Sequence, residues 1–192
     1  MNLSGNERLP DSWLNQFDGA SVMVNLTLAS PQLQTMFRRA YYFAAHQLHA
    51  VLITSRRRVS DLDTQRAEQG VGDVLRAGLS SIGAQTKEAQ QLIEAAGESF
   101  RPLCDRALSY AVRVVSPYGH AHIDLFRASD ELIARLDYAR RENIIAEAEY
   151  RRRLACAKHP LRRVKRKIND VYQRTRLVGT SVQRARCADQ AR

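Results

Sequence analysis

The sequence lacks the features that mark several large classes of protein. No apolar run approaches the roughly 18 residues that a membrane-spanning helix needs, and the N-terminus lacks the basic and then apolar pattern of a signal peptide. Its three cysteines, Cys104, Cys156 and Cys187, lie far apart and form no CxxC pair. An odd number of scattered cysteines predicts free thiols in a reducing compartment. We therefore expect an intracellular, cytoplasmic protein without integral membrane insertion, and a nuclear or organellar location stays open.

Motifs that indicate catalysis or a bound cofactor are also missing. The glycines within residues 71–84 form neither GxGxxG nor GxxxxGK(S/T), so no phosphate-cradling loop is predicted. His120 and His122, with Asp124 close by, are the best catalytic candidates, but no nucleophile stands at a known spacing from them. We interpret residues 116–120 as a turn, with surface histidines at and just after it. We predict no enzymatic activity, no catalytic residue, no metal site and no cofactor.

Acidic residues are scarce in only one part of the chain. Residues 1–100 hold 9 Lys and Arg against 10 Asp and Glu, and residues 101–150 hold 7 against 8. Residues 151–192 hold 14 against 2, so the formal net charge of +10 lies entirely in the last 42 residues. Such asymmetry is typical of a surface that binds a polyanion. Arg outnumbers Lys 26 to 4, which suits bidentate contacts to phosphate but equally fits a GC-rich gene.

Residues 159–179 place this charge on an amphipathic pattern. Their less polar side chains recur at spacings of three and four, at Leu161, Val164, Ile168, Val171, Thr175 and Val178. This spacing predicts a helix with one narrow buried seam and a cationic remainder. Pro160 predicts a break before it, so we expect an antiparallel or sharply bent pair with the preceding helix. The cations assigned to polyanion binding, here and just upstream, are Arg151, Arg152, Arg153, Lys158, Arg162, Arg163, Lys165, Arg166, Lys167, Arg174 and Arg176.

Helical patterns also fill most of the chain before residue 159. Ser30 and Pro31 form a favourable helix start, a capping hydroxyl followed by proline at the first helical position. Ser129 and Asp130 likewise predict the start of a long helix. Pro102 is expected to interrupt a helical stretch. The predicted helices before residue 159 span residues 30–58, 71–84, 86–100, 103–116 and 129–158.

The N-terminal segment shows no sustained helical period. Residues 21–28 alternate weakly between apolar and polar, but no second convincing strand is available to pair with them, so an extended arm is expected. The predicted fold class is therefore all-α, an irregular bundle of five or six helices with a C-terminal basic amphipathic helix. The predicted regions are an N-terminal arm (1–29), a helical core domain (30–158), the basic helix packed on it (159–179) and a flexible polar tail (180–192).

Two functions of different classes fit these features. The first is a non-enzymatic nucleic-acid-binding protein, RNA before DNA, that contacts the phosphate backbone through the basic helix. The alternative is a structural or adaptor subunit of a large macromolecular assembly that docks through its helical surfaces. The three-and-four seam would also suit a second copy, so a homo-oligomer is a further expected partner. An anionic membrane is disfavoured, because the seam lacks bulky apolar side chains.

Overall fold

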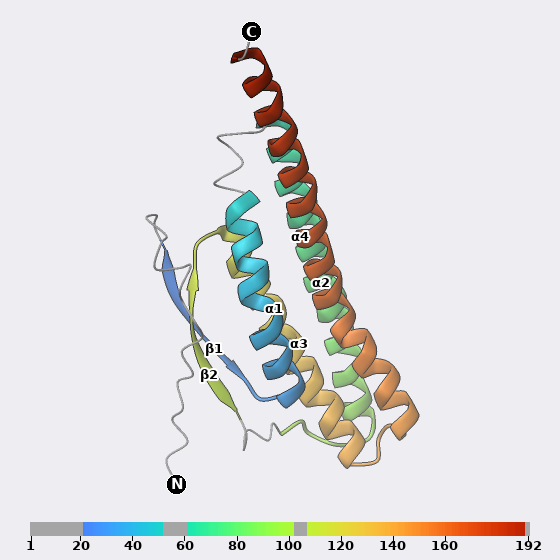
Figure 1. Ribbon diagram of the computed structural model, residues 1–192. Helices are drawn as coiled ribbons and strands as arrows, with labels where there is room; N and C mark the ends of the chain where they lie inside the picture. Colours follow the sequence, from blue (N-terminus) through green and yellow to red (C-terminus); the bar gives the residue numbers. More distant parts are fainter. Residues whose placement is uncertain (1–20, 52–60, 102–106, 191–192) are drawn as a thin grey trace.

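The computed structural model describes residues 21–51, 61–101 and 107–190, with side chains omitted for residues 61–64 and 176–190. Figure 1 shows three layers: the two strands, then α1 with α3, then α2 with α4. The protein is mostly helical, as predicted, but the described residues form four helices and a two-stranded sheet instead of five or six helices. The elements in chain order are β1 (Val22–Leu28), α1 (Pro31–His49), α2 (Asp61–Ala95), β2 (Leu108–Val114), α3 (Pro117–Arg141) and α4 (Glu147–Gln190). No helix in the described part of the chain is long and apolar enough to cross a membrane.

The sheet corrects two predictions. Strands β1 and β2 pair antiparallel, with Val22 opposite Val114 and Leu28 opposite Leu108. Residues 22–28 are thus a paired strand and not an extended arm, and residues 108–114 are not part of a helix. Alternate residues face the core, which is the strand period of two. The buried members of this face are Leu26, Leu28, Tyr110, Val112 and Val114.

Helix α1 begins at Pro31, as predicted, but its N-terminus is bound by a residue far away in the chain. Ser30 makes no side-chain capping hydrogen bond. Instead the carboxylate of Asp130, on α3, accepts hydrogen bonds from the backbone N–H groups of Ala29 (2.7 Å) and Ser30 (2.9 Å). Burial raises the pKa of Asp130, although these two hydrogen bonds oppose that shift. The predicted end of this helix near Arg58 lies outside the described residues.

Helix α2 replaces two predicted helices and the connection before them. It runs without interruption over Asp61–Ala95, although breaks were expected near residues 70 and 85. Gly78 shows why a glycine stands within this helix. A Cβ atom at residue 78 would lie 3.3 Å from Cβ of Pro160 and 3.4 Å from the methyl groups of Leu125. The missing side chain therefore lets α2, α3 and α4 approach one another closely.

Helix α3 begins where a turn was predicted. Ser116 caps it by accepting a hydrogen bond from the Gly119 N–H at 3.1 Å, and Pro117 occupies its first turn. The helix then passes through residues 129–131, where a new helix was expected to start. It ends at Arg141, and Asn143 takes a left-handed φ of 57° before α4 begins. The predicted helix over residues 129–158 is therefore divided between α3 and α4.

His122 is buried, contrary to the predicted surface position. Its ring centroid lies 5.6 Å from that of Tyr41 and 5.2 Å from that of Phe126. Burial lowers the pKa of His122 to about 4, because the charged imidazolium is disfavoured in an apolar environment. His120, in contrast, is exposed. The two histidines point to different environments and do not form a shared site.

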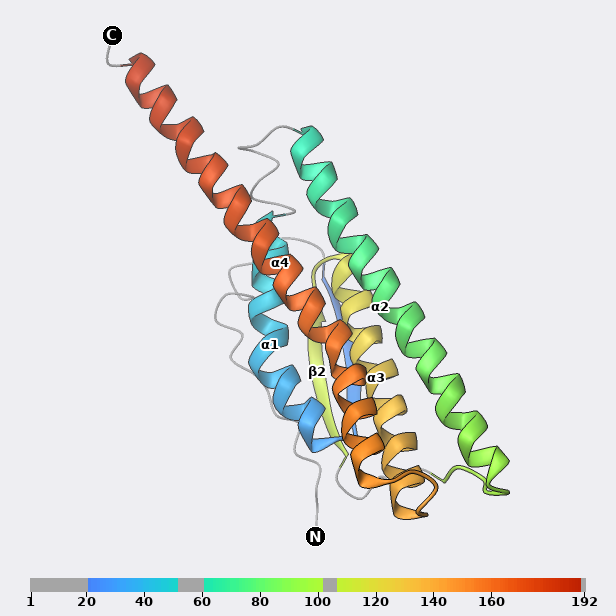
Figure 2. The same cartoon turned by 90° about the vertical axis from the view of Figure 1, so that its right-hand side faces the viewer.

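Helix α4 continues through Pro160, where a break was predicted. The residues on either side of the expected break therefore belong to one helix of 44 residues. Its last turns extend beyond α1 and α2 (Figure 1 and Figure 2). Proline removes one backbone hydrogen bond from a helix interior. Here its ring is buried against α2 at Gly78, so tertiary packing offsets part of the local cost.

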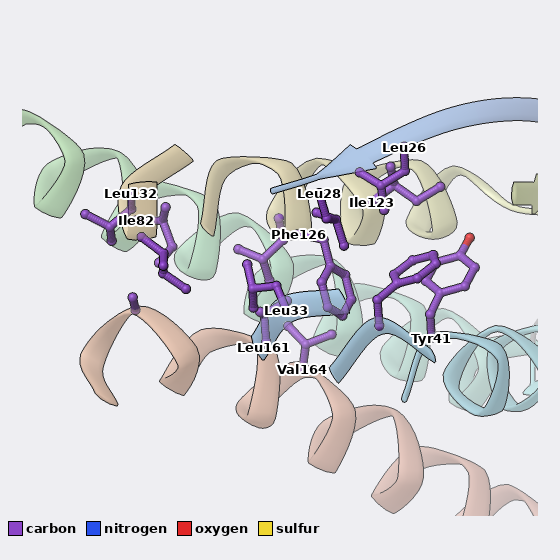
Figure 3. Close-up of a cluster of buried hydrophobic side chains, with 14 of the residues drawn as sticks. Leu26, Leu28, Leu33, Tyr41, Ile82, Ile123, Phe126, Leu132, Leu161 and Val164 are labelled. Carbon is purple, nitrogen blue, oxygen red and sulfur yellow. The ribbon is translucent and has the colours of Figure 1, made fainter. Parts of the chain in front are cut away.

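The hydrophobic core lies where the three layers meet. Figure 3 shows side chains from β1 and from all four helices pointing toward one another, with the ring of Phe126 near Leu28 and Leu33. Phe126 packs edge-on to Phe37 at 5.2 Å between ring centroids, and Phe37 also stacks on Tyr41 at 4.8 Å. Other buried members labelled in Figure 3 are Leu26, Leu28, Leu33, Ile82, Ile123, Leu132, Leu161 and Val164.

Candidate nucleic-acid interface

The apolar seam of the basic segment is buried, as the sequence predicted. Leu161, Val164 and Ile168 are at most 2% exposed, and Val171 is also buried. Thr175 is half-buried, and the side chain of Val178 lies outside the described residues. Because one side of α4 is held against the body, the cationic positions at other angles around the helix face outward.

Contacts on both sides fix the rotation of α4. On one side, Lys158 donates a hydrogen bond from Nζ to the side-chain oxygen of Gln32 on α1, and Gln47 donates to Asn169 at 2.9 Å. On the other side, the chain of Lys167 lies over α2, where a Cβ at Gly70 would stand 3.0 Å from its Cε. Figure 2 shows α4 crossing the face of the molecule in front of α1 and α3.

The first group of predicted site residues is already paired with acids. Arg151 contacts Glu147 at 2.8 Å, and Arg152 and Arg153 both contact Glu149, at 2.8 and 2.6 Å. Hydrogen bonds from Arg152 and Arg153 hold the pKa of Glu149 at about 2. Arg153 also lies 3.6 Å from Glu88 of α2. These three arginines therefore have carboxylate partners within the protein.

The second group, the predicted cations from Arg162 onward, has no such partners among the described residues. Its members are exposed except for the half-buried Lys167, and no described carboxylate lies within 4 Å of their charged nitrogens. Burial lowers the pKa of Lys158, the nearby positive charge of Arg162 lowers it further, and the carboxylate of Asp137 opposes the shift. Arg176 belongs to the same predicted set, but its side chain lies outside the described residues. We name as the α4 cationic face Arg162, Arg163, Lys165, Arg166, Lys167 and Arg174.

The α4 cationic face surrounds the outer side of the helix. At about 100° per residue, Arg162 and Arg166 lie near its centre, and Lys165 lies toward α1. Lys167 lies toward α2, as its position over Gly70 shows. Asp170 is the only acid between residues 158 and 175. Such a surface has the charge and the spacing to contact several anionic groups at once.

Other candidate sites are not supported by the described residues. No group of three or more His, Cys, Asp or Glu side chains that could hold a metal ion occurs among them. Cys156 is a free thiol on the surface, while Cys104 lies outside the described residues.

Residues 151–153 were predicted to belong to the phosphate-binding set. The spacing of Glu147 to Arg151 and of Glu149 to Arg153 already indicated pairs within the helix.

Comparison with known proteins gives a fold and no family. No protein-family profile matches the chain, and no curated protein matches its sequence. Among solved structures, the chain is similar to selenomethionine-containing AcaB from uropathogenic E. coli, with a TM-score of 0.79 and 16% sequence identity. The similarity covers 85% of this chain and 85% of that one. At this identity the likeness shows that the two chains share a fold.

Proposed function

We propose that this protein binds nucleic acid, RNA before DNA, through the phosphate backbone, and that it is not an enzyme. The contacts come from the α4 cationic face. Each phosphate that an Arg or Lys neutralises releases condensed counterions, so several such contacts on one rigid helix add to a substantial affinity.

The observation that carries this proposal is the difference in pairing along α4. Arg151, Arg152 and Arg153 contact acids of the protein itself, whereas Arg162, Arg163 and Arg166 are exposed without a described carboxylate partner. An unpaired cation gives its full charge to a ligand, while a paired one must first lose its partner. The interface therefore begins after Lys158 and excludes the preceding three arginines.

The contacts are expected to be directed at backbone more than at bases. The described outer side of α4 carries no exposed aromatic ring on which a base could stack, since Tyr172 is half-buried beside the core. Contacts to phosphate position a nucleic acid without reading its sequence. We therefore expect little dependence of affinity on base sequence.

Two matched triple variants test the assignment. Arg162→Gln, Arg163→Gln and Arg166→Gln remove three positive charges from the α4 cationic face. Arg151→Gln, Arg152→Gln and Arg153→Gln remove the same charge from the paired group. Three lost phosphate contacts at physiological salt correspond to an affinity loss on the order of 100-fold, and the paired group should lose far less.

Fluorescence anisotropy with labelled single- and double-stranded RNA and DNA measures these affinities, and circular dichroism checks that each variant is folded. Equal losses in the two triple variants would show that overall charge, not this face, governs binding. If the unaltered protein binds none of the four ligands at low salt, nucleic-acid binding is wrong. That result would favour the adaptor subunit, whose partner would be an acidic protein.

A further inference from the structure

Among the described residues, one edge of strand β1 is unprotected. Within the described residues the sheet has two strands, so one side of β1 has no strand beside it. Its sequence, VMVNLTL, contains no charged residue, no proline and no glycine, and the pairing with β2 runs from Val22 to Leu28 without a bulge. Charges, prolines and bulges are the usual means of preventing strand edges from pairing with other chains. This edge has none of them.

Side-chain exposure also distinguishes β1 from β2. Val22 and Met23 are 55% and 60% exposed, which is unusual for large apolar residues, and Asn25 and Thr27 are exposed as well. In β2 only Ser109 is exposed. The more open strand is therefore also the uncharged one.

We propose that the free edge of β1 pairs antiparallel with the same edge of a second copy of this chain. The product is a four-stranded sheet in the order β2, β1, partner β1, partner β2, across a twofold axis. Two-fold contacts of this kind use the same surface on both subunits. The partner is the chain itself because the strand is complementary to its own reversed sequence.

That complementarity appears when the pairing is centred on Asn25. Val24 then lies opposite the partner's Leu26, and Val22 lies opposite the partner's Leu28. Each core-facing apolar residue therefore meets another one, and the exposed Val22 gains an apolar neighbour. On the other face, Met23 lies opposite the partner's Thr27, and Asn25 lies opposite the partner's Asn25. No pair brings like charges together.

The interface leaves the α4 cationic face free. Figure 1 shows the sheet on the side of α1 and α3 that is opposite to α4. Dimerisation through β1 is therefore independent of the proposed nucleic-acid binding, and its failure would not affect that proposal.

The test uses opposite charges at the centre of the proposed pairing. Asn25→Lys puts two positive charges opposite each other in a dimer, and Asn25→Asp puts two negative charges there. We expect the unaltered 192-residue chain to sediment at twice its monomer mass of 21.8 kDa, and each variant alone to sediment as a monomer. An equimolar mixture of the two variants should regain the dimer mass, because Lys then lies opposite Asp. Ser109→Lys, on the outer face of β2 and away from the axis, is the matched control and should stay dimeric.

Sedimentation equilibrium separates the outcomes, with circular dichroism confirming that every variant is folded. A monomeric unaltered protein would overturn the proposal. The same monomeric result is expected if another part of the chain covers this edge. A dimer that persists in both Asn25 variants would place the interface elsewhere. Failure of the mixture to recover the dimer would exclude the register centred on Asn25.

Discussion

Two segments of α4, residues 147–158 and residues 159–175, called here its first and second halves, carry the same kinds of residue and use them differently. In the first half, three arginines contact Glu147, Glu149 and Glu88, and Tyr150 donates a hydrogen bond to Asp137 at 2.6 Å. In the second half, the outward cations have no described acidic partner, and the helix is held by a continuous apolar seam. The nearest available carboxylate, and not the arginine itself, determines whether a cation is structural or free for a ligand.

The contrast also concerns how each half is attached to the body. The first half combines polar contacts with the half-buried Leu154 and the buried Tyr150 and Ala157, and Arg140 lies over the ring of Tyr150 at 4.8 Å. The second half depends on buried aliphatic side chains. Hydrophobic attachment leaves charged side chains unengaged, so it suits a surface that must keep its charge for a partner.

The largest expected effect is on stability, from shortening one leucine in each half. Leu161 is buried in the seam of the second half, so Leu161→Ala should lower the free energy of unfolding by about 2 to 5 kcal/mol. Leu154→Ala, at a half-buried position seven residues earlier, should cost about 1 kcal/mol. Urea denaturation of both variants measures the difference. Equal costs would contradict the hydrophobic attachment of the second half.

A smaller effect is expected at the junction of the halves. Proline is less favourable than alanine in a helix interior by about 3 kcal/mol, whereas the ring of Pro160 contributes about 1.6 kcal/mol through two buried methylenes. Pro160→Ala should therefore raise the free energy of unfolding by about 1 kcal/mol, because α4 already runs through this position. A loss of helical circular dichroism, or a clear destabilisation, would show that the proline is needed where it stands.

The smallest effect is a pH dependence confined to the first half. Arg152 and Arg153 hold the pKa of Glu149 at about 2, below its ordinary value of 4.5. A lowered pKa means that this contact stabilises the folded state above about pH 4.5 and is lost as the pH falls through about 2. Melting temperatures measured from pH 5 down to pH 2 should fall less steeply in Glu149→Gln than in the unaltered protein. Parallel curves would indicate that the contact of Glu149 with Arg152 and Arg153 contributes nothing measurable.

Sequence patterns were sufficient where the local signal and the tertiary environment agree. The start of α1 was predicted from the preference of proline for the first helical position, at Pro31, and the buried residues Leu161, Val164 and Ile168 were predicted from helical spacing. Both depend on residues close together in the chain. The mostly helical content of the protein was also predicted correctly, because helical spacing is a pattern of residues close together in the chain.

The errors arose where distant residues decide the structure. Residues 108–114 fit a helical spacing as well as an alternating one, and only pairing with β1, whose partner residues lie 80 to 92 positions earlier, selects the strand. Asp130 resembles a residue in the first turn of its own helix, yet it binds the N-terminus of α1. The rule that a proline interrupts a helix fails at Pro160, because Gly78 on another helix leaves space for the proline ring. For the candidate site, the cations were predicted from composition and helical spacing, and the i,i+4 spacing indicated the pairs Glu147–Arg151 and Glu149–Arg153, whereas the contact of Arg153 with Glu88 on another helix required the structure.

The most direct test of the different roles of the two halves is the salt dependence of RNA binding. Plots of log affinity against log salt concentration would be measured for the unaltered protein and for the two triple variants at residues 162, 163 and 166 and at residues 151–153. Each lost phosphate contact should reduce the slope by about 0.7 to 0.9. We predict that the first variant loses about 2 to 3 units of slope and that the second keeps nearly the full slope. The opposite result, or equal losses in both variants, would contradict the assignment of the interface to the second half of α4.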